Sequence, residues 1–214
     1  MKKYLPIIIV AAVLIFDQWL KIYVKLNFKL HESYTVFADW FELYFVENNG
    51  MAFGWAFGGK VGKLILSLFR VFASIFIFSY WRKLMKKDTP TGYTISIGLI
   101  FAGAVGNIID SLIYGPLFGP SLEWTLATFL PEQGGYAPML FGNVVDMLHF
   151  SLFYWPEWIP LLGNTEFFSP IFNIADASIT GGIIAIFIFY RGYFEKEFGK
   201  NKTEEVSKIE NSYE

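Results

Sequence analysis

Two aspartates stand in apolar surroundings where a charged side chain is costly. Asp146 lies in the stretch Phe-Gly-Asn-Val-Val-Asp-Met-Leu, and Asp176 opens an apolar run that continues to Phe189. An ionised carboxylate in hydrocarbon costs roughly 2.5–3.5 kcal/mol even on a lenient insertion scale. Side chains this expensive are functional candidates by default. We therefore interpret Asp146 and Asp176 as a carboxylate pair that performs acid–base chemistry.

An asparagine stands three positions before each of these aspartates, and the same pattern occurs once more in the chain. On a helix, residues three apart share a face, so each asparagine is expected to orient its carboxylate. Asn143 equally suits the cap of a turn. The three pairs are Asn107 with Asp110, Asn143 with Asp146, and Asn173 with Asp176.

The composition narrows the class of protein. The 214 residues are 54% hydrophobic and 20% aromatic, and the mean hydropathy is +0.42, which is typical of membrane proteins. No basic stripe indicates nucleic acid as a partner. The absence of cysteine excludes disulfides and thiolate chemistry, and two histidines, His31 and His149, are too few for a multi-histidine metal site. We expect carboxylate chemistry without a metal or cofactor.

Four segments are long and apolar enough to cross a bilayer, which needs about 20 residues. The first follows Met-Lys-Lys, but it has no convincing small-x-small cleavage site, so we interpret it as an uncleaved span. The last is slightly short. The predicted spans cover approximately residues 5–24, 61–81, 93–114 and 174–190.

Basic residues predict the orientation of these spans. They precede the first span, fill the loop between the second and third, and follow the fourth, whereas residues 115–172 contain no Lys or Arg. Both termini are therefore expected in the cytoplasm, and both long loops outside. The exceptions on the outward side are Lys25, Lys29, Lys60 and Lys63.

The outward loops carry structure of their own. Residues 35–46 are rich in β-branched and aromatic side chains and lead into the turn signal Glu-Asn-Asn-Gly, which predicts a small strand pair. Residues 153–162 predict a short amphipathic helix at the membrane interface. Interfacial aromatic residues of the long loop are Trp124, Tyr154, Trp155 and Trp158.

These elements together predict an all-α polytopic membrane protein with four transmembrane helices, a small β element and an interfacial helix. We expect one integral membrane domain over residues 1–195. The charged and polar residues 196–214 are expected to form a disordered cytoplasmic tail.

Five stretches form an ordered set of motifs over nearly the whole chain. They are Asp17-Gln-Trp-Leu-Lys21, Asn48-Asn-Gly-Met-Ala-Phe53, Gly103-Ala-Val-Gly-Asn-Ile-Ile-Asp110, Val144-Val-Asp146 and Phe172-Asn-Ile-Ala-Asp176. In this order, on a four-span topology, they resemble lipoprotein signal peptidase, also called signal peptidase II, a family of bacterial intramembrane aspartyl proteases.

The resemblance implies that Asp146 and Asp176 are the catalytic dyad. It also implies a substrate, a prolipoprotein whose future N-terminal cysteine bears a diacylglyceryl group and which is cleaved just before that cysteine. We expect a monomer in the bacterial inner membrane, in contact with phospholipid, with its site near the outer face. Residues implied to shape the site, hold the substrate or support the dyad are Asn48, Gly50, Asn107, Asp110, Asn173, Asp17 and Lys21.

The chemistry of a carboxylate pair agrees with this resemblance. Two carboxylates a few ångströms apart cannot both ionise cheaply, so they share one proton. The ionised member takes a proton from water, and the protonated member polarises the scissile carbonyl. On the sequence, either aspartate fits either role.

The chain departs from the family pattern in two places. The family usually has an arginine directly after Gly-Asn-x-x-Asp, where this chain has Ser111, and residues 116–141 intervene before Val-Val-Asp. We hypothesise that Arg70, in the middle of the second span, supplies the missing charge, although snorkelling or pairing with backbone carbonyls suits it equally. The insertion is expected to form a lid or a partner surface.

Other interpretations stay open at this stage. Asp17 and Lys21 are spaced for a simple intrahelical ion pair, Asn48 and Gly50 for a hairpin turn, and Asp110 for a solvated helix boundary. Intramembrane carboxylates also occur in ion or proton transporters, although no inverted repeat is visible here. The third class is a non-catalytic lipoprotein-binding membrane protein.

Overall fold

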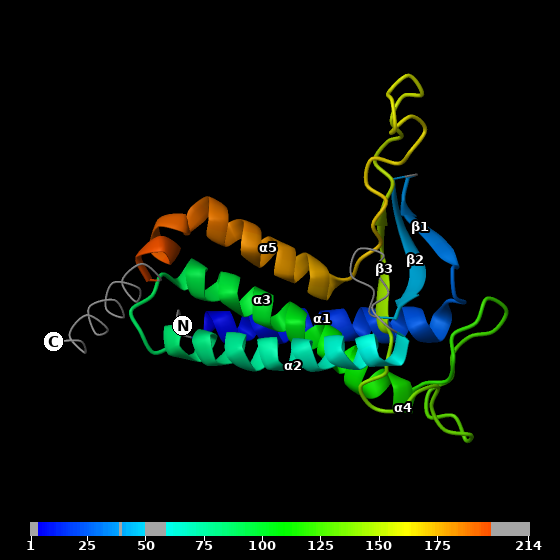
Figure 1. Ribbon diagram of the computed structural model, residues 1–214, viewed down its shortest axis with the longest axis horizontal. Coiled ribbons are helices and arrows are strands. Elements are labelled where there is room, and N and C mark those ends of the chain that lie inside the picture. The colour runs from blue at the N-terminus through cyan, green and yellow to red at the C-terminus, as the bar shows by residue number, and fades with distance from the viewer. Residues whose placement is uncertain (1–3, 39, 50–58, 198–214) are drawn as a thin grey trace.

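Long helices form one layer of the molecule. The computed structural model describes residues 4–38, 40–49 and 59–197. In it, α1 (Leu5–Asn27), α2 (Gly59–Leu84), α3 (Thr91–Ile109) and α5 (Ile174–Phe189) lie side by side (Figure 1). All four predicted spans are therefore helical, each close to its predicted range.

Three of these helices are long and apolar enough to cross a membrane. They are α1, α2 and the helical stretch Thr91–Leu117 that begins with α3. The fourth, α5, has 16 residues, about 24 Å at 1.5 Å per residue. It qualifies only together with the short helix Arg191–Glu197, from which it is bent by 88°. The structure thus has three to four candidate spans.

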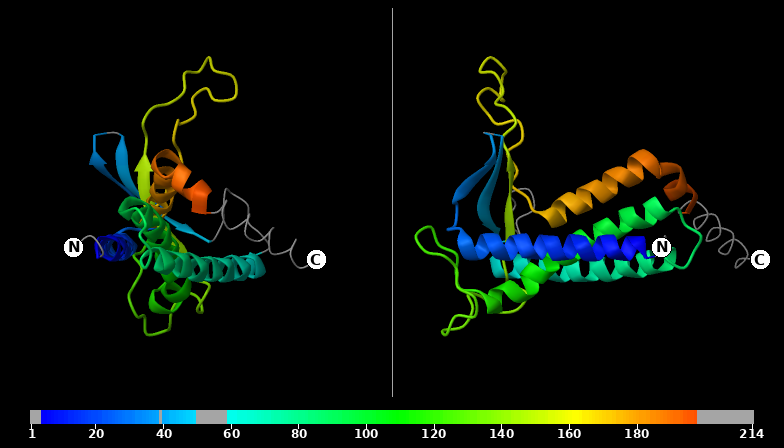
Figure 2. Two further views of the ribbon diagram at one scale, coloured as in Figure 1. Left: turned by 90° about the vertical axis from the view of Figure 1, so that its left-hand side faces the viewer. Right: turned by 180° about the vertical axis from the view of Figure 1, so that it is seen from behind.

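α3 is the central helix and packs against α1, α2 and α5 (Figure 2). Glycines let α3 and α5 approach closely, as is common between membrane helices. A Cβ atom at Gly103 would lie 2.2 Å from the carbonyl oxygen of Ala175, and one at Gly182 would lie 2.6 Å from that of Ser96. Larger side chains at these positions would push the two helices apart.

The carboxyl end of α3 widens into the π-helical turn η1 (Asp110–Tyr114), followed by the short helix α4 (Gly115–Leu117). Such π-turns are rare and are often found at functional sites. Here the turn begins at Asp110, the aspartate of the first Asn-x-x-Asp motif in the chain.

A three-stranded antiparallel sheet stands across one end of the helices (Figure 1). Its order is β1 (Ser33–Phe37), β2 (Phe41–Asn48) and β3 (Val144–Phe150). The strand pair predicted from residues 35–46 is confirmed. The third strand was not predicted, and its pairing places Asp146 opposite Val46 and ends with Val144 opposite Asn48.

The insertion at residues 116–141 folds back against the sheet. Phe118 is 1% exposed and packs in one cluster with Val24, Phe45 and Val145, while Tyr136 covers its edge. Part of the insertion therefore belongs to the hydrophobic core that supports β2 and β3.

The expected interfacial helix at residues 153–162 is absent from the described structure, so that prediction was wrong. The segment forms turns within a long loop that extends from β3 away from the helices (Figure 1). Pro156 and Pro160 explain the difference, because a proline lacks the N–H that a helix interior requires. Trp158 and Leu161 are exposed at 80% and 100%, and they provide the apolar surface that the sequence led us to expect there.

Two predictions fall outside the described residues. Gly50 is one of them, and residues 198–214 of the predicted tail are the other. Lys196 and Glu197 end the last helical turns.

Candidate active site

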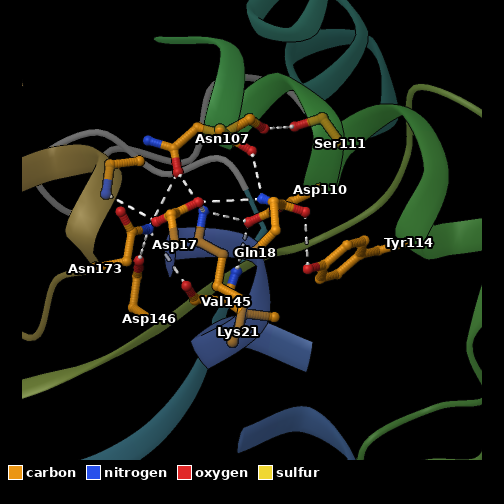
Figure 3. Close-up of polar contacts among 12 residues, drawn as sticks. Asp17, Gln18, Lys21, Asn107, Asp110, Ser111, Tyr114, Val145, Asp146 and Asn173 are labelled. Atoms are coloured by element: carbon orange, nitrogen blue, oxygen red, sulfur yellow. Dashed lines mark hydrogen bonds and ion pairs between the residues drawn. The ribbon is translucent and has the colours of Figure 1, made fainter. Parts of the chain in front are cut away.

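Lys21 is the centre of a buried polar cluster between α1 and α3 (Figure 3). Its Nζ atom lies 3.0 Å from Asp17 Oδ2, 2.8 Å from Asp110 Oδ2 and 3.0 Å from Asn107 Oδ1. The predicted i,i+4 ion pair with Asp17 is present, but Lys21 also joins α1 to α3. All three charged side chains are at most 1% exposed. Buried charges require such partners, because desolvation costs several kcal/mol per ion.

Gln18 connects the same carboxylates a second time. Its Nε2 atom donates to Asp17 Oδ2 at 3.1 Å and to Asp110 Oδ1 at 3.0 Å, and its Oε1 accepts from the Tyr114 hydroxyl at 3.1 Å (Figure 3). Our sequence analysis did not select Gln18 or Tyr114. Gln18 is a polar residue inside a predicted span, between the selected positions Asp17 and Lys21, and this feature could have identified it from the sequence.

Asp176 sits in the first turn of α5, where a capping box fixes it. Asn173 Oδ1 accepts from the Asp176 N–H at 2.8 Å, and Asp176 Oδ2 accepts from the Asn173 N–H at 3.4 Å. Asp17 Oδ1 accepts from the Ala175 N–H at 2.8 Å, so α1 caps the same helix end. These bonds satisfy N–H groups that a helix start leaves unpaired.

Asp146 reaches the site from β3. Its Oδ1 accepts from Asn173 Nδ2 at 2.6 Å, and its side chain is 4% exposed. Burial, and to a smaller extent the negative charge of Asp176, raise the pKa of Asp146 to about 7, although Lys21 and Asn173 oppose the shift. Asp176 is only half-buried. The two aspartates therefore lie in one site but differ in how far they are buried.

The asparagines of two motifs each bond the carboxylate of a different motif. Asn107 Nδ2 donates to Asp176 Oδ1 at 2.8 Å, and Asn173 Nδ2 also lies 3.1 Å from Asn107 Oδ1. Of the three asparagines, Asn173 alone bonds the carboxylate of its own Asn-x-x-Asp motif, in which the Asn173 N–H donates to Asp176 Oδ2. Asn107 serves Asp176 of another helix instead of Asp110.

Arg70 approaches the site at the position where the family arginine is missing. Its Nη1 donates to Ser111 Oγ at 3.3 Å, and Ser111 Oγ donates to the Asn107 carbonyl at 3.1 Å. Arg70 is thus joined through Ser111 to the residue that bonds Asp176, which places a positive charge on the α2 side of the site.

A second buried cluster lies one helical turn further along α1 and was not foreseen. Lys25, which is 0% exposed, pairs with Glu47 of β2 and donates to Ser121 Oγ at 3.0 Å. Asn143 belongs here: its Nδ2 donates to Glu47 Oε2 at 2.7 Å, and Lys63 Nζ donates to Asn143 Oδ1 at 2.5 Å. The expectation that Asn143 orients Asp146 was wrong, because residues 144–150 form a strand, in which residues three apart face opposite sides.

The remaining candidates lie at the margin of the site. Asn48 ends β2 opposite Val144, near the start of the strand that carries Asp146. His149 lies at the other end of β3, between Glu42 at 2.8 Å and Glu166 at 3.2 Å.

Comparisons with known proteins identify the family of this chain. A family model described as signal peptidase (SPase) II matches residues 9–191. A lipoprotein signal peptidase of Porphyromonas gingivalis is 42% identical over 187 residues, covering 85% of this chain and 80% of the relative. Another, of Amoebophilus asiaticus, is 30% identical and covers 97% of this chain and 86% of the relative.

A solved structure described as a bacterial membrane enzyme has a similar fold. It superimposes with a TM-score of 0.57 at 28% identity, over 86% of this chain and 85% of that one. The ordered motifs, the polar site between helices and these relatives lead to one conclusion. The chain belongs to the signal peptidase II family of bacterial intramembrane aspartic proteases, which remove signal peptides from lipoproteins.

Proposed function

We propose that this protein cleaves diacylglyceryl-modified prolipoproteins just before the lipid-modified cysteine, with Asp146 and Asp176 as the catalytic dyad. The observation that carries the proposal is the bridge through Asn173, whose Nδ2 donates to Asp146 Oδ1 at 2.6 Å and whose backbone N–H donates to Asp176 Oδ2 at 3.4 Å. One asparagine thereby contacts both carboxyl groups.

The environments of the two aspartates favour different protonation states. Asp146 is buried, and because its pKa is raised to about 7 it keeps a proton at a pH where an ordinary aspartate has lost it. Asp176 accepts hydrogen bonds from Asn107 Nδ2 at 2.8 Å and from the Asn173 N–H, and it lies at a helix start, where the dipole stabilises negative charge. We assign the shared proton to Asp146 and the negative charge to Asp176.

With this assignment, hydrolysis proceeds without a covalent intermediate. Asp176 removes a proton from a water molecule while the water oxygen bonds to the scissile carbonyl carbon. At the same time Asp146 gives its proton to the carbonyl oxygen. When the tetrahedral intermediate collapses, Asp176 passes its proton to the leaving nitrogen and the C–N bond breaks. A hydroxyl of the intermediate returns a proton to Asp146, which restores the starting state.

Arg70 has a supporting role in this proposal. Its bond to Ser111, and the link from Ser111 through Asn107 to Asp176, support a positive charge on the α2 side of the ionised aspartate. We expect Arg70→Ala to lower kcat roughly ten- to a hundredfold, since one fixed charge or donor at such a site contributes on that order. Arg70→Lys should recover part of the loss. Unchanged cleavage by Arg70→Ala would exclude the role.

The topology follows from the same proposal. We infer four spans with both termini in the cytoplasm, so that the sheet and the dyad lie near the outer face of the inner membrane. A prolipoprotein presents its cleavage site at that depth. We further infer a single peptidase domain over residues 1–195, acting as a monomer.

The deciding experiment is cleavage of a diacylglyceryl-modified prolipoprotein by purified protein. Asp146→Asn and Asp176→Asn should each abolish cleavage while the protein stays folded. Asp88→Asn, an exposed aspartate between α2 and α3, is the matched control and should cleave at the wild-type rate. Activity that survives either dyad substitution would contradict the mechanism.

A further inference from the structure

A cavity of about 510 Å³ lies beside the candidate active site, between the first turns of α2 and the insertion. Pockets for small molecules typically have volumes of about 300–1,000 Å³. Its lining contains two lysines of α2, Lys60 and Lys63, and a mainly apolar group from the insertion, Tyr136, Ala137, Pro138 and Phe141. Asn49 and Asn143 complete it.

The charges around this cavity do not balance. Glu47 is the acid of the neighbouring cluster, and Lys25 already pairs with it. Lys63 donates to the neutral amide oxygen of Asn143. Lys60 is exposed and has no ion-pair partner among the residues that the structure describes. Lys60 and Lys63 therefore bring two positive charges to the lining, and none of the lining residues is a carboxylate.

The position of these lysines is unusual for a membrane protein. α2 is a candidate span, and its first turns lie beside β3 at the sheet end of the helices (Figure 1). In the topology proposed above this is the outward end, where lysines are less frequent than at the cytoplasmic end. Lys25 is explained by its buried pair, whereas nothing in the proteolytic site uses Lys60 or Lys63.

We propose that this pocket binds the phosphate of an anionic phospholipid headgroup from the outer leaflet, with Lys60 and Lys63 as its donors. The phosphate accepts charge-assisted hydrogen bonds from the two ammonium groups. The apolar part of the lining, at Pro138 and Phe141, contacts the glycerol region of the same lipid. The assignment to the outer leaflet rests on the proposed function.

Binding at this place has a structural consequence. Lys63 reaches the lipid phosphate with one N–H while another holds Asn143, the residue immediately before β3. A bound headgroup thereby stabilises the start of the strand that carries Asp146.

The test measures lipid binding to the full-length Asp176→Asn variant in a zwitterionic detergent, so that its outcome does not depend on proteolysis. Short-chain phosphatidylglycerol should bind saturably with one-to-one stoichiometry in calorimetry or native mass spectrometry. Adding Lys60→Ala should weaken this binding at least about fivefold, because one basic residue near an anionic lipid contributes about that factor. Lys60→Glu should abolish it.

Lys29→Ala is the matched control, since Lys29 is exposed on the same outward side but lies outside the pocket, and it should bind like the parent. Equal binding of phosphatidylcholine, or no saturable binding, would overturn the proposal. Inorganic phosphate that competes as well as the lipid would identify a free-anion site instead. If Lys60→Ala left phosphatidylglycerol binding unchanged, and in the otherwise wild-type enzyme it raised only the KM for substrates with acidic residues after the cysteine, the lipid proposal would be overturned and the pocket would belong to the substrate.

Discussion

Two lysines of α1, one turn apart, are both fully buried, but their surroundings differ in charge. Lys21 meets two carboxylates, Asp17 and Asp110, at 3.0 and 2.8 Å. Lys25 meets one carboxylate, Glu47, and its ammonium also lies 4.9 Å from the ring of Tyr136. The first cluster carries excess negative charge next to Asp146 and Asp176, whereas the pair formed by Lys25 is neutral.

This difference separates a chemical role from a structural one. An excess of carboxylates favours keeping one proton in the active site, and burial assigns that proton to Asp146. The pair of Lys25 and Glu47 is neutral without an added proton. It connects α1 to β2, and both side chains also bond Ser121 of the insertion. Variants of the two clusters should therefore respond differently.

The largest effect is expected from Lys21→Met. It leaves two buried carboxylates without their cation, and breaking a buried pair in this way costs about 3–5 kcal/mol of the free energy of unfolding. Thermal unfolding in detergent at pH 7 measures the loss. Lys29→Met, at an exposed lysine, should change stability by no more than about 0.5 kcal/mol. A Lys21→Met protein as stable as the control would show that the cluster is not held by its charges.

Asp146→Asn should stabilise the protein at high pH. The pKa of about 7 lies above the ordinary value of 3.8, so the folded protein binds this proton more tightly than the unfolded chain does. The free energy of unfolding therefore falls as pH rises from about 4 to about 7 and stays low above that. The substitution removes this loss, on the order of 2–4 kcal/mol at pH 8. The gain should vanish near pH 4, and a gain independent of pH would contradict the assignment.

The pH dependence of wild-type cleavage should report the protonation of Asp146. If Asp146 must be protonated, the cleavage rate under kcat/KM conditions falls about tenfold per pH unit once pH exceeds about 7. Initial rates from pH 6 to 9, with stability checked at each pH, test this. A rate that rises through this range would mean that Asp146 acts as the ionised member.

Lys25→Met is expected to cost less than Lys21→Met, about 1–3 kcal/mol. Glu47 keeps two donors, Ser121 Oγ at 2.6 Å and Asn143 Nδ2 at 2.7 Å, and its side chain is 9% exposed. The double variant Lys25→Met with Glu47→Gln should recover most of the loss, because the pair is neutral. A double-mutant cycle by thermal unfolding measures the coupling. No recovery would mean that Lys25 acts mainly through packing.

The sequence predicted the site better than it predicted the scaffold. Polar side chains in apolar spans must find partners inside the protein, so most of the selected residues lie together. They are Asp17, Lys21, Asn107, Asp110, Asn173, Asp146 and Asp176. The strand at residues 144–150 was missed, since Val-Val-Asp-Met-Leu-His-Phe lacks polar alternation and its two faces are both covered near Val145. The partner of Asn143 could not be foreseen either, because it depends on how an insertion folds.

The smallest effects compare two tyrosine hydroxyls, one at the margin of each cluster. Tyr136 Oη accepts from the Asn143 N–H at 2.6 Å, and Tyr114 Oη donates to Gln18 Oε1 at 3.1 Å. Each Tyr→Phe change removes one hydrogen bond, which contributes about 1 kcal/mol, so both proteins should lose similar stability.

The kinetics of the two variants should differ. Tyr114→Phe loosens Gln18 and with it the carboxylates beside the dyad, so kcat should fall severalfold at constant KM. Tyr136→Phe loosens the cluster around Asn143 and Glu47 and should leave kcat within about twofold, since the Asn143 side chain bonds Glu47 and not Asp146. Equal losses of kcat would show that the two clusters act as one unit, and that the charge balance of Lys25 and Glu47 does not isolate them from catalysis.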